Sequence, residues 1–152
     1  LTHAKALTMS ANHPDEIDHL VSRFFAVFDN RGGRNATADE FVALFAPAAV
    51  IVSHVGREVT FNTPDDFVRP RLALLSAGQL TDFSEWETGA ETECLDSLAC
   101  RRSRYEKRGE LAGEPYHGTG TKFFHFARTA VGWRIVALSW IDDASPASTP
   151  AP

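Results

Sequence analysis

Four long segments in the C-terminal half of the chain constrain its fold more than any other feature of the sequence. They span about residues 82–95, 98–109, 116–128 and 133–142, and their residue pattern has a period of two. Such a period is typical of β-strands, whose successive side chains point to opposite faces. Because only short turns separate the segments, we predict four long antiparallel strands.

The first part of the chain has the spacing of helices instead. Apolar residues recur every three or four positions from Ile17 to Phe28, which predicts a helix with one apolar face. A β-branched strand follows at about residues 49–55, and a short one at about 58–61. Helices followed by a run of antiparallel strands indicate an α+β fold, in which the helices cover one face of the sheet.

A few residues mark helix starts and interruptions. Thr37-Ala38-Asp39-Glu40 has the pattern of a capping box, and Thr63-Pro64 opens a third helix. Pro70 lies too deep for a straight helix and is predicted to kink it or to split off its first turn. Gly118 and Gly120 lie inside a strand pattern and predict a bulge that bends the sheet.

Size and charge limit the classes of protein to consider. The chain has 152 residues, which suits one domain, and a formal net charge of -5. This acidic balance argues against a nucleic-acid partner, and no apolar run is long enough to span a membrane. The first residues lack the apolar segment of a secretory signal, so we expect a cytoplasmic protein. We expect one domain at residues 14–143, between flexible tails at 1–13 and 144–152.

The hairpin around Asp96-Ser97 separates charged from weakly polar side chains. If these two residues form the turn, Leu95 faces Leu98 and one face of the hairpin carries opposite charges in pairs. That face would hold Glu85, Glu87, Glu91 and Glu93 across from Arg102, Arg104 and Arg108. Cross-strand ion pairs of this kind are typical of a solvated surface, so we predict that this face is exposed.

The other face of the same hairpin is predicted to line a cavity. It carries small, polar and aromatic side chains, among them Trp86, Arg101 and Tyr105. A sheet face that must meet helices but carries such residues suits a cavity better than a packed core. In this register Cys94 and Cys100 lie on opposite faces, so we expect no disulfide between them. The sequence contains no metal-ligand spacing and no glycine-rich phosphate loop, and we predict neither a metal nor a cofactor.

The last two strands carry apolar residues on both faces, including Phe123 and Phe124. A strand that is apolar on both sides is covered on both sides. The first helix would cover the inner face, and no remaining element covers the outer one, so we predict a homodimer through the C-terminal strands. On the same strands we expect Lys122 to reach solvent at a strand edge and Asp142 to lie at a solvated end.

Individual side chains of these segments are candidates for chemistry. His54 ends the first strand, where an imidazole at a cavity mouth could act as a general base, and Tyr105 could act as a proton donor. His125 is either a hydrogen-bonded residue of the dimer interface or an acid–base group of the cavity. Arg101 and Tyr105 could orient a polar or anionic ligand. The candidate ligand-binding residues are Phe24, Phe28, Trp86, Arg101 and Tyr105.

The order of elements, together with EFVALFAPAAVIVSHVG, DFSEWET and KFFHFARTAVGWRIVALSWIDD, resembles the nuclear-transport-factor-2-like superfamily. Within it the chain resembles the small bacterial proteins grouped as SnoaL-like, over about residues 14–143. The resemblance implies a cone-shaped, curved antiparallel sheet wrapped around a long N-terminal helix, with two further helices and a pocket at the open end. Ketosteroid isomerases of the superfamily use a Tyr on the first helix. Here that helix carries Phe24, Phe25 and Phe28, so the isomerase residues are not carried over.

These observations predict a small-molecule-binding domain with a mostly apolar pocket, which takes a hydrophobic or aromatic compound. Two alternatives stay open. One is a cofactor-independent isomerase, cyclase or dehydratase that acts on a hydrophobic substrate. The other is a non-catalytic dimerisation module whose cavity is closed by Phe and Trp side chains. A ligand should raise the melting temperature of a binding domain or of an enzyme, and it should have no effect on a dimerisation module with a closed cavity.

Overall fold

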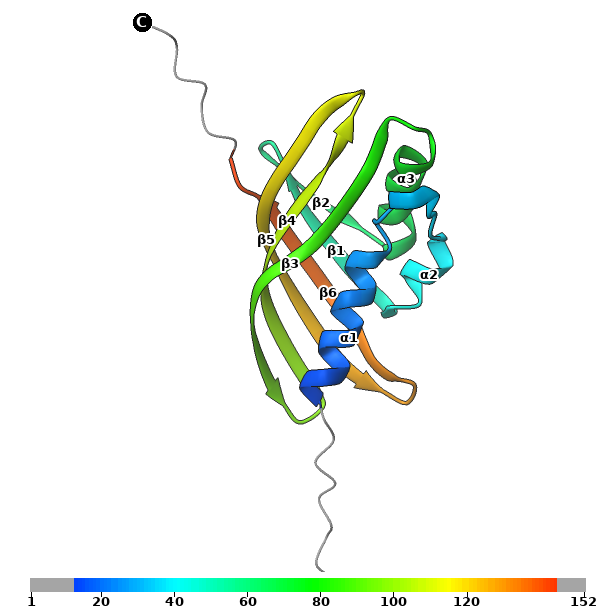
Figure 1. The fold of residues 1–152 in the computed structure, drawn as a ribbon. Coiled ribbons are helices and arrows are strands. Elements are labelled where there is room, and N and C mark those ends of the chain that lie inside the picture. The colour runs from blue at the N-terminus through cyan, green and yellow to red at the C-terminus, as the bar shows by residue number, and fades with distance from the viewer. Residues whose placement is uncertain (1–12, 145–152) are drawn as a thin grey trace, which may run out of the picture.

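The computed structural model describes residues 13–144, which form three α-helices, a short 3-10 helix and a six-stranded curved sheet (Figure 1). The helical elements are α1 (His13–Ala26), η1 (Arg31–Gly33), α2 (Ala38–Val42) and α3 (Pro64–Ser76). The α+β fold expected from the sequence is therefore confirmed. Most of the two predicted tails lies outside the described residues. No helix within residues 13–144 is both long and apolar enough to cross a membrane.

The strands lie in the order β2-β1-β6-β5-β4-β3. Their bounds are β1 (Phe45–Val55), β2 (Glu58–Asn62), β3 (Leu80–Leu95), β4 (Leu98–Leu111), β5 (Glu114–Thr129) and β6 (Gly132–Asp142). Neighbouring strands pair antiparallel except β1 and β6, which are parallel. The four long strands expected from the sequence correspond to β3, β4, β5 and β6, with small differences at their ends.

An aromatic cluster joins the helices to the inner face of the sheet. The Phe24 ring of α1 lies edge-on to the Phe124 ring of β5, with 5.2 Å between the ring centroids. Phe24 also contacts Phe41 of α2 at 5.6 Å, and Phe41 contacts Phe67 of α3 at 5.7 Å. Each such pair contributes about 0.5–1.5 kcal/mol beyond its buried area. The predicted apolar face of α1 thus forms the centre of the core.

The predicted helix starts are confirmed by their hydrogen bonds. The backbone N–H of Glu40 donates to Thr37 Oγ1 at 3.2 Å, and the backbone N–H of Thr37 donates to Glu40 Oε2 at 2.6 Å. The backbone N–H of Asp66 donates to Thr63 Oγ1 at 3.2 Å and begins α3. Both caps satisfy backbone donors that would otherwise lack a partner in the first turn of a helix.

Of the two outcomes predicted at Pro70, a kink or a split, the split is wrong, because the helix continues through this residue to Ser76. A proline within a helix removes one backbone hydrogen bond. On α3 the buried side chains of Phe67 and Val68 precede Pro70, and buried Leu75 follows it. Packing on both sides of the proline therefore keeps the helix in one piece.

The Asp96-Ser97 turn forms as predicted. Leu95 lies opposite Leu98, and Glu91 lies opposite Arg102. Glu91 and Arg102 form an exposed ion pair at 3.0 Å, which confirms that this end of the hairpin has a solvated face.

Farther from the turn, one extra residue in β3 changes the register. The pairing shifts between Glu87 and Gly89, so Glu87 lies opposite Tyr105. A bulge of this kind reverses the faces of the side chains just before it, here back to the second register shift between Thr81 and Ser84. Glu85 and Glu87 therefore lie on the inner face, and Trp86 lies on the outer face. The predicted faces of these three residues are wrong, because the prediction assumed regular alternation and the bulge interrupts it.

The predicted bulge at Gly118 and Gly120 is also wrong. Both residues pair with β4 in a continuous register, and Gly120 pairs with Asp142 of β6. The reason for glycine is close contact with side chains from β4. An added Cβ at Gly120 would overlap the Tyr105 hydroxyl, and one at Gly118 would come within 2.8 Å of Lys107 Cε. Glycine here makes room for two side chains of the inner face.

Candidate functional site

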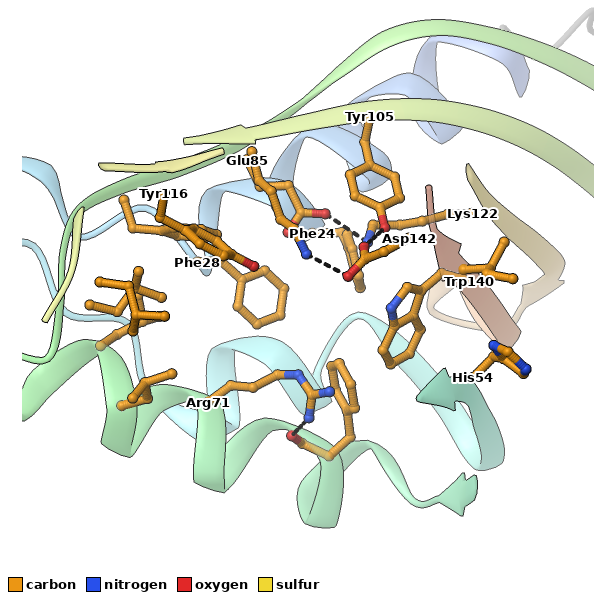
Figure 2. Close-up of a pocket in the computed structure, with 18 of the residues that line it drawn as sticks. Phe24, Phe28, His54, Arg71, Glu85, Tyr105, Tyr116, Lys122, Trp140 and Asp142 are labelled. Carbon is orange, nitrogen blue, oxygen red and sulfur yellow. Dashed lines mark hydrogen bonds and ion pairs between the residues drawn. The ribbon is translucent and has the colours of Figure 1, made fainter. Parts of the chain in front are cut away.

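A cavity of about 640 Å³ opens between α3 and the inner face of the sheet (Figure 2). Its apolar walls come from every layer of the fold and are largely aromatic. They include Phe24, Phe28, Phe67, Phe83, Tyr116 and Trp140. Cavities that hold small ligands usually measure about 300–1,000 Å³ and combine apolar walls with a few polar groups.

The first polar group of the cavity is an ion pair between β3 and β5. Lys122 Nζ lies 2.6 Å from Glu85 Oε1, and the two side chains are only 7% and 10% exposed. Within residues 13–144 no group has the geometry to donate a hydrogen bond to Glu85 Oε1, so we describe its contact with Lys122 as an ion pair. The ammonium also lies 3.8 Å from the centroid of the Tyr105 ring. Burial lowers the pKa of Lys122, and Glu85 opposes that effect.

The second polar group centres on Asp142, at the end of β6. Tyr105 donates a hydrogen bond to Asp142 Oδ1, and Lys107 Nζ donates to Asp142 Oδ2 at 2.8 Å. Tyr105, Gly120 and Asp142 lie in one row across β4, β5 and β6. Since Gly120 has no side chain, the Tyr105 ring can pass over β5 and reach the carboxylate.

The ionisation states of these groups follow from burial and hydrogen bonding. Burial would raise the pKa of Asp142, but the hydrogen bonds from Lys107 and Tyr105 outweigh it and lower this pKa. Burial, and then the neighbouring Asp142 carboxylate, raise the pKa of Tyr105 far above its usual value. Burial lowers the pKa of Lys107, but Asp142 more than offsets this and raises it. At neutral pH the cluster holds a carboxylate, a neutral phenol and an ammonium.

The third polar group, Arg71, faces this cluster from α3 (Figure 2). Its Nη1 donates to the backbone oxygen of Phe67 at 2.9 Å. The guanidinium carbon lies 3.6 Å from the centroid of the Phe67 ring and 5.4 Å from that of Trp140. Burial lowers the pKa of Arg71 to about 10, and Glu85 and Asp142 oppose this effect. The guanidinium is therefore charged at neutral pH.

Four of the residues predicted to be catalytic or to bind a ligand line this cavity. They are Phe24, Phe28, His54 and Tyr105. Phe24 and Phe28 form part of the apolar wall, while exposed His54 lies at the rim beside Trp140 (Figure 2). Tyr105 is buried, and its hydroxyl is already bound to Asp142.

Arg101 points inward as predicted but lies outside this cavity. It donates to Asp18 Oδ1 of α1 at 2.6 Å and to Thr92 Oγ1 at 2.9 Å. It also forms a two-point contact with Glu87, through Nε at 3.0 Å and through Nη2. The guanidinium therefore joins α1 to the sheet, and these intramolecular partners occupy the groups that were predicted to bind a ligand.

Trp86 and His125 lie on the outer face of the sheet. The bulge in β3 turns Trp86 away from the cavity, so its predicted place in the cavity wall is wrong. His125 is exposed and lies beside Cys100 of β4, on the face opposite to Phe124. Of the two interpretations of His125, the cavity acid–base group is excluded by this position. Cys94 and Cys100 are both free, as expected.

Most of the charged groups of the cavity were not predicted from the sequence. Lys122 was expected to reach solvent but is buried in the cavity wall. Asp142 is exposed, as expected, and its side chain also lines the cavity. Lys122 lies two residues before buried Phe124 and therefore on the same face of the strand, which was the available signal that its position is buried. Arg71 lies one helical turn after Phe67, which indicates the same helix face. Their pairing partners could not be inferred, because the partners come from other strands. Residues 13–144 contain no group of three His, Cys, Asp or Glu side chains that could hold a metal ion.

Comparison with solved structures finds the same fold in proteins of low sequence identity. A nuclear transport factor 2 superfamily protein from Salmonella enterica matches with a TM-score of 0.68 and 14% identity, over 91% of this chain and 96% of that one. An NTF2-like protein with a cystatin-like fold from Novosphingobium aromaticivorans matches with a TM-score of 0.61 and 19% identity, over 84% and 80%. The chain therefore has the nuclear-transport-factor-2-like fold that the resemblance implied.

A third similar structure is a hexachlorocyclohexane dehydrochlorinase from Novosphingobium barchaimii. It matches with a TM-score of 0.68 and 11% identity, over 86% of each chain. No protein-family model matches the sequence, and no curated protein matches it. A fold shared at this level of identity does not determine an activity, which depends instead on the side chains that line the cavity.

Proposed function

We propose that this protein binds a hydrophobic or aromatic small molecule in the cavity between α3 and the sheet. The observation that carries the proposal is the cavity of about 640 Å³, which is lined mainly by aromatic and aliphatic side chains and by a few charged groups. A dimerisation module with a closed cavity would have this space filled by Phe and Trp side chains. A ligand that binds this cavity in the folded protein only will stabilise the fold.

Binding can be tested with the neutral fluorescent compound N-phenyl-1-naphthylamine. We expect its emission to increase on addition of the protein, and we expect the melting temperature of the protein to rise with ligand concentration. Leu74→Trp, in the cavity wall, should fill the space and abolish both effects. Val59→Trp, at an exposed position of β2, is the control and should retain them.

Two results would contradict the proposal. One is the absence of any response of the wild-type protein to the probe. The other is equal affinity for Leu74→Trp and the wild-type protein, provided that circular dichroism shows both to be folded. The second result would place the probe on the surface.

A cofactor-independent isomerase, cyclase or dehydratase is the second candidate function, and the SnoaL-like resemblance stays a prediction within it. The observation in its favour is that Tyr105, Lys122 and Asp142 have displaced pKa values at the cavity wall, as groups in active sites often do. We place binding first because Asp142 is held as a carboxylate and is a weak base. Turnover of a bound compound that is lost in both Tyr105→Phe and His54→Ala would reverse this order.

A further inference from the structure

We infer that the ligand of this cavity carries a single negative charge on a carboxylate, which Arg71 receives. This inference rests on the proposed function and adds the chemical class of the ligand to it. The structure supports it through the charge balance of the cavity, the geometry of Arg71 and the placement of the two acidic side chains.

The charges that line the cavity do not balance. Three side chains are cationic, namely Arg71, Lys107 and Lys122, and two are carboxylates, namely Glu85 and Asp142. Each lysine has a carboxylate partner, because Lys122 pairs with Glu85 at 2.6 Å and Lys107 pairs with Asp142 at 2.8 Å. Within residues 13–144 Arg71 forms no ion pair. The cavity therefore has one positive charge in excess, located on α3.

The geometry of Arg71 suits a carboxylate. A guanidinium has five N–H donors in one plane and binds both oxygens of a carboxylate through two parallel hydrogen bonds. One donor is directed at the backbone oxygen of Phe67, and one face of the group stacks on the Phe67 ring. These contacts hold the guanidinium in place while other N–H groups stay available. Since little side-chain freedom is lost on binding, the site is preorganised for an anion.

Arg71 is partly shielded from solvent, which gives its charge a reason to need such a partner. A charge that is removed from water without a counter-ion is costly, and a bound anion relieves that cost. The lowered pKa of Arg71 is the expected result of this burial. An exposed arginine would gain little from the same contact, because water already solvates it.

The two acidic side chains limit the charge of the ligand. Glu85 and Asp142 lie near enough to raise the pKa of Arg71, so they also repel an anion bound to it. With one positive charge in excess, the cavity can balance a monoanion but not a dianion such as a phosphate monoester. The aromatic side chains of Phe24, Phe28 and Tyr116 then surround the apolar body. An aromatic or aliphatic monocarboxylate combines the two requirements.

The test compares 2-naphthoate with 2-naphthamide, which has nearly the same shape and no charge, by isothermal titration calorimetry on the full chain. We expect the wild-type protein to bind 2-naphthoate about 10- to 100-fold more tightly than 2-naphthamide, because a charged hydrogen-bonded pair is replaced by a neutral one. Arg71→Met keeps the aliphatic stem and should lose this preference. Arg69→Met is the matched control, because Arg69 lies on the same helix, is exposed and pairs with Asp65; it should keep the preference.

The outcomes separate this inference from the proposed function. If N-phenyl-1-naphthylamine binds but 2-naphthoate is not preferred over 2-naphthamide, the carboxylate assignment is wrong and the binding function stands. If Arg71→Met keeps the preference, another group receives the anion and the assignment is also wrong. If none of the three compounds binds, the proposed function itself fails. Should Arg71→Met not fold, Arg71→Lys replaces it, and a preference as large as that of the wild-type protein would overturn the two-point contact.

Discussion

Buried ions distinguish this cavity from an ordinary apolar core. Glu85 and Lys122 are both nearly inaccessible to solvent, and Lys122 lies on the same face of β5 as buried Phe124. A buried ion pair contributes little net stability compared with apolar residues of similar volume, but removal of one partner leaves an uncompensated charge. The pair therefore keeps a polar wall in a largely apolar cavity rather than strengthening the core.

Glu85→Gln tests this view at the level of one residue. We expect the free energy of unfolding to fall by about 3 kcal/mol, because buried Lys122 loses the carboxylate that forms an ion pair with it. Glu91→Gln is the control, since Glu91 and Arg102 form an exposed pair in the same hairpin. Its effect should stay within about 1 kcal/mol. Chemical denaturation measures both, and equal effects of the two variants would contradict the buried pair.

The pH dependence of Glu85→Gln provides a second measurement on the same variant. Without Glu85, burial should lower the pKa of Lys122 further below its usual 10.5. Between that lowered pKa and 10.5 the unfolded chain binds more protons than the folded protein, so stability rises with pH. The difference from the wild-type protein should therefore shrink as pH approaches 10.5. A difference that stays constant with pH would mean that the charge of Lys122 is not involved.

At the scale of elements, one inserted residue in β3 and one glycine in β5 determine what reaches the cavity. The bulge before Gly89 brings Glu85 to the inner face, where Lys122 lies. Gly120 leaves space for the Tyr105 ring to reach Asp142. Both features act by changing which side chains of neighbouring strands can meet.

Gly120→Ala tests the role of the glycine. The added Cβ would overlap the Tyr105 hydroxyl and the backbone oxygen of Ile141, which cannot move away. We expect a loss of about 1–3 kcal/mol in the free energy of unfolding, as is typical of overpacking. Gly89→Ala is the matched control, since an added Cβ there meets no atom within 4 Å. Equal denaturation midpoints for the two variants would contradict the steric argument.

At the scale of the whole molecule, the two faces of the sheet differ. The three described α-helices lie on the inner side of the sheet, whereas the outer face of β5 and β6 has no cover within residues 13–144 (Figure 1). Phe123 and Ile141 are each 46% exposed on that outer face. We keep the prediction of a homodimer through these strands, since burial of such side chains favours association.

Phe123→Glu tests the dimer by sedimentation velocity at micromolar concentrations. We expect a dimer for the wild-type protein and a monomer for the variant, because a carboxylate would be buried twice at a symmetric interface. Val131→Glu is the control and should stay dimeric, since Val131 is 72% exposed in the turn between β5 and β6. A wild-type protein that sediments as a monomer at these concentrations would refute the prediction.

What the sequence alone determined was local. The apolar stripe of α1, the cap at Thr37 and the turn at Asp96-Ser97 all depend on residues within a few positions of one another. Spacing and side-chain chemistry are sufficient for such features, because the interacting groups are held together by the chain itself. The order of these elements was also sufficient to indicate the fold.

The tertiary structure decided which charges face the cavity. The bulge in β3 leaves no mark in the alternation of residues, yet it brings Glu85 inside and turns Trp86 outward. Arg71, Lys122 and Asp142 come from a helix and two strands, and they approach one another only when the sheet curves around α3. A charged side chain is buried when a partner or a cavity compensates its lost solvation, and that compensation comes from residues far away in the sequence.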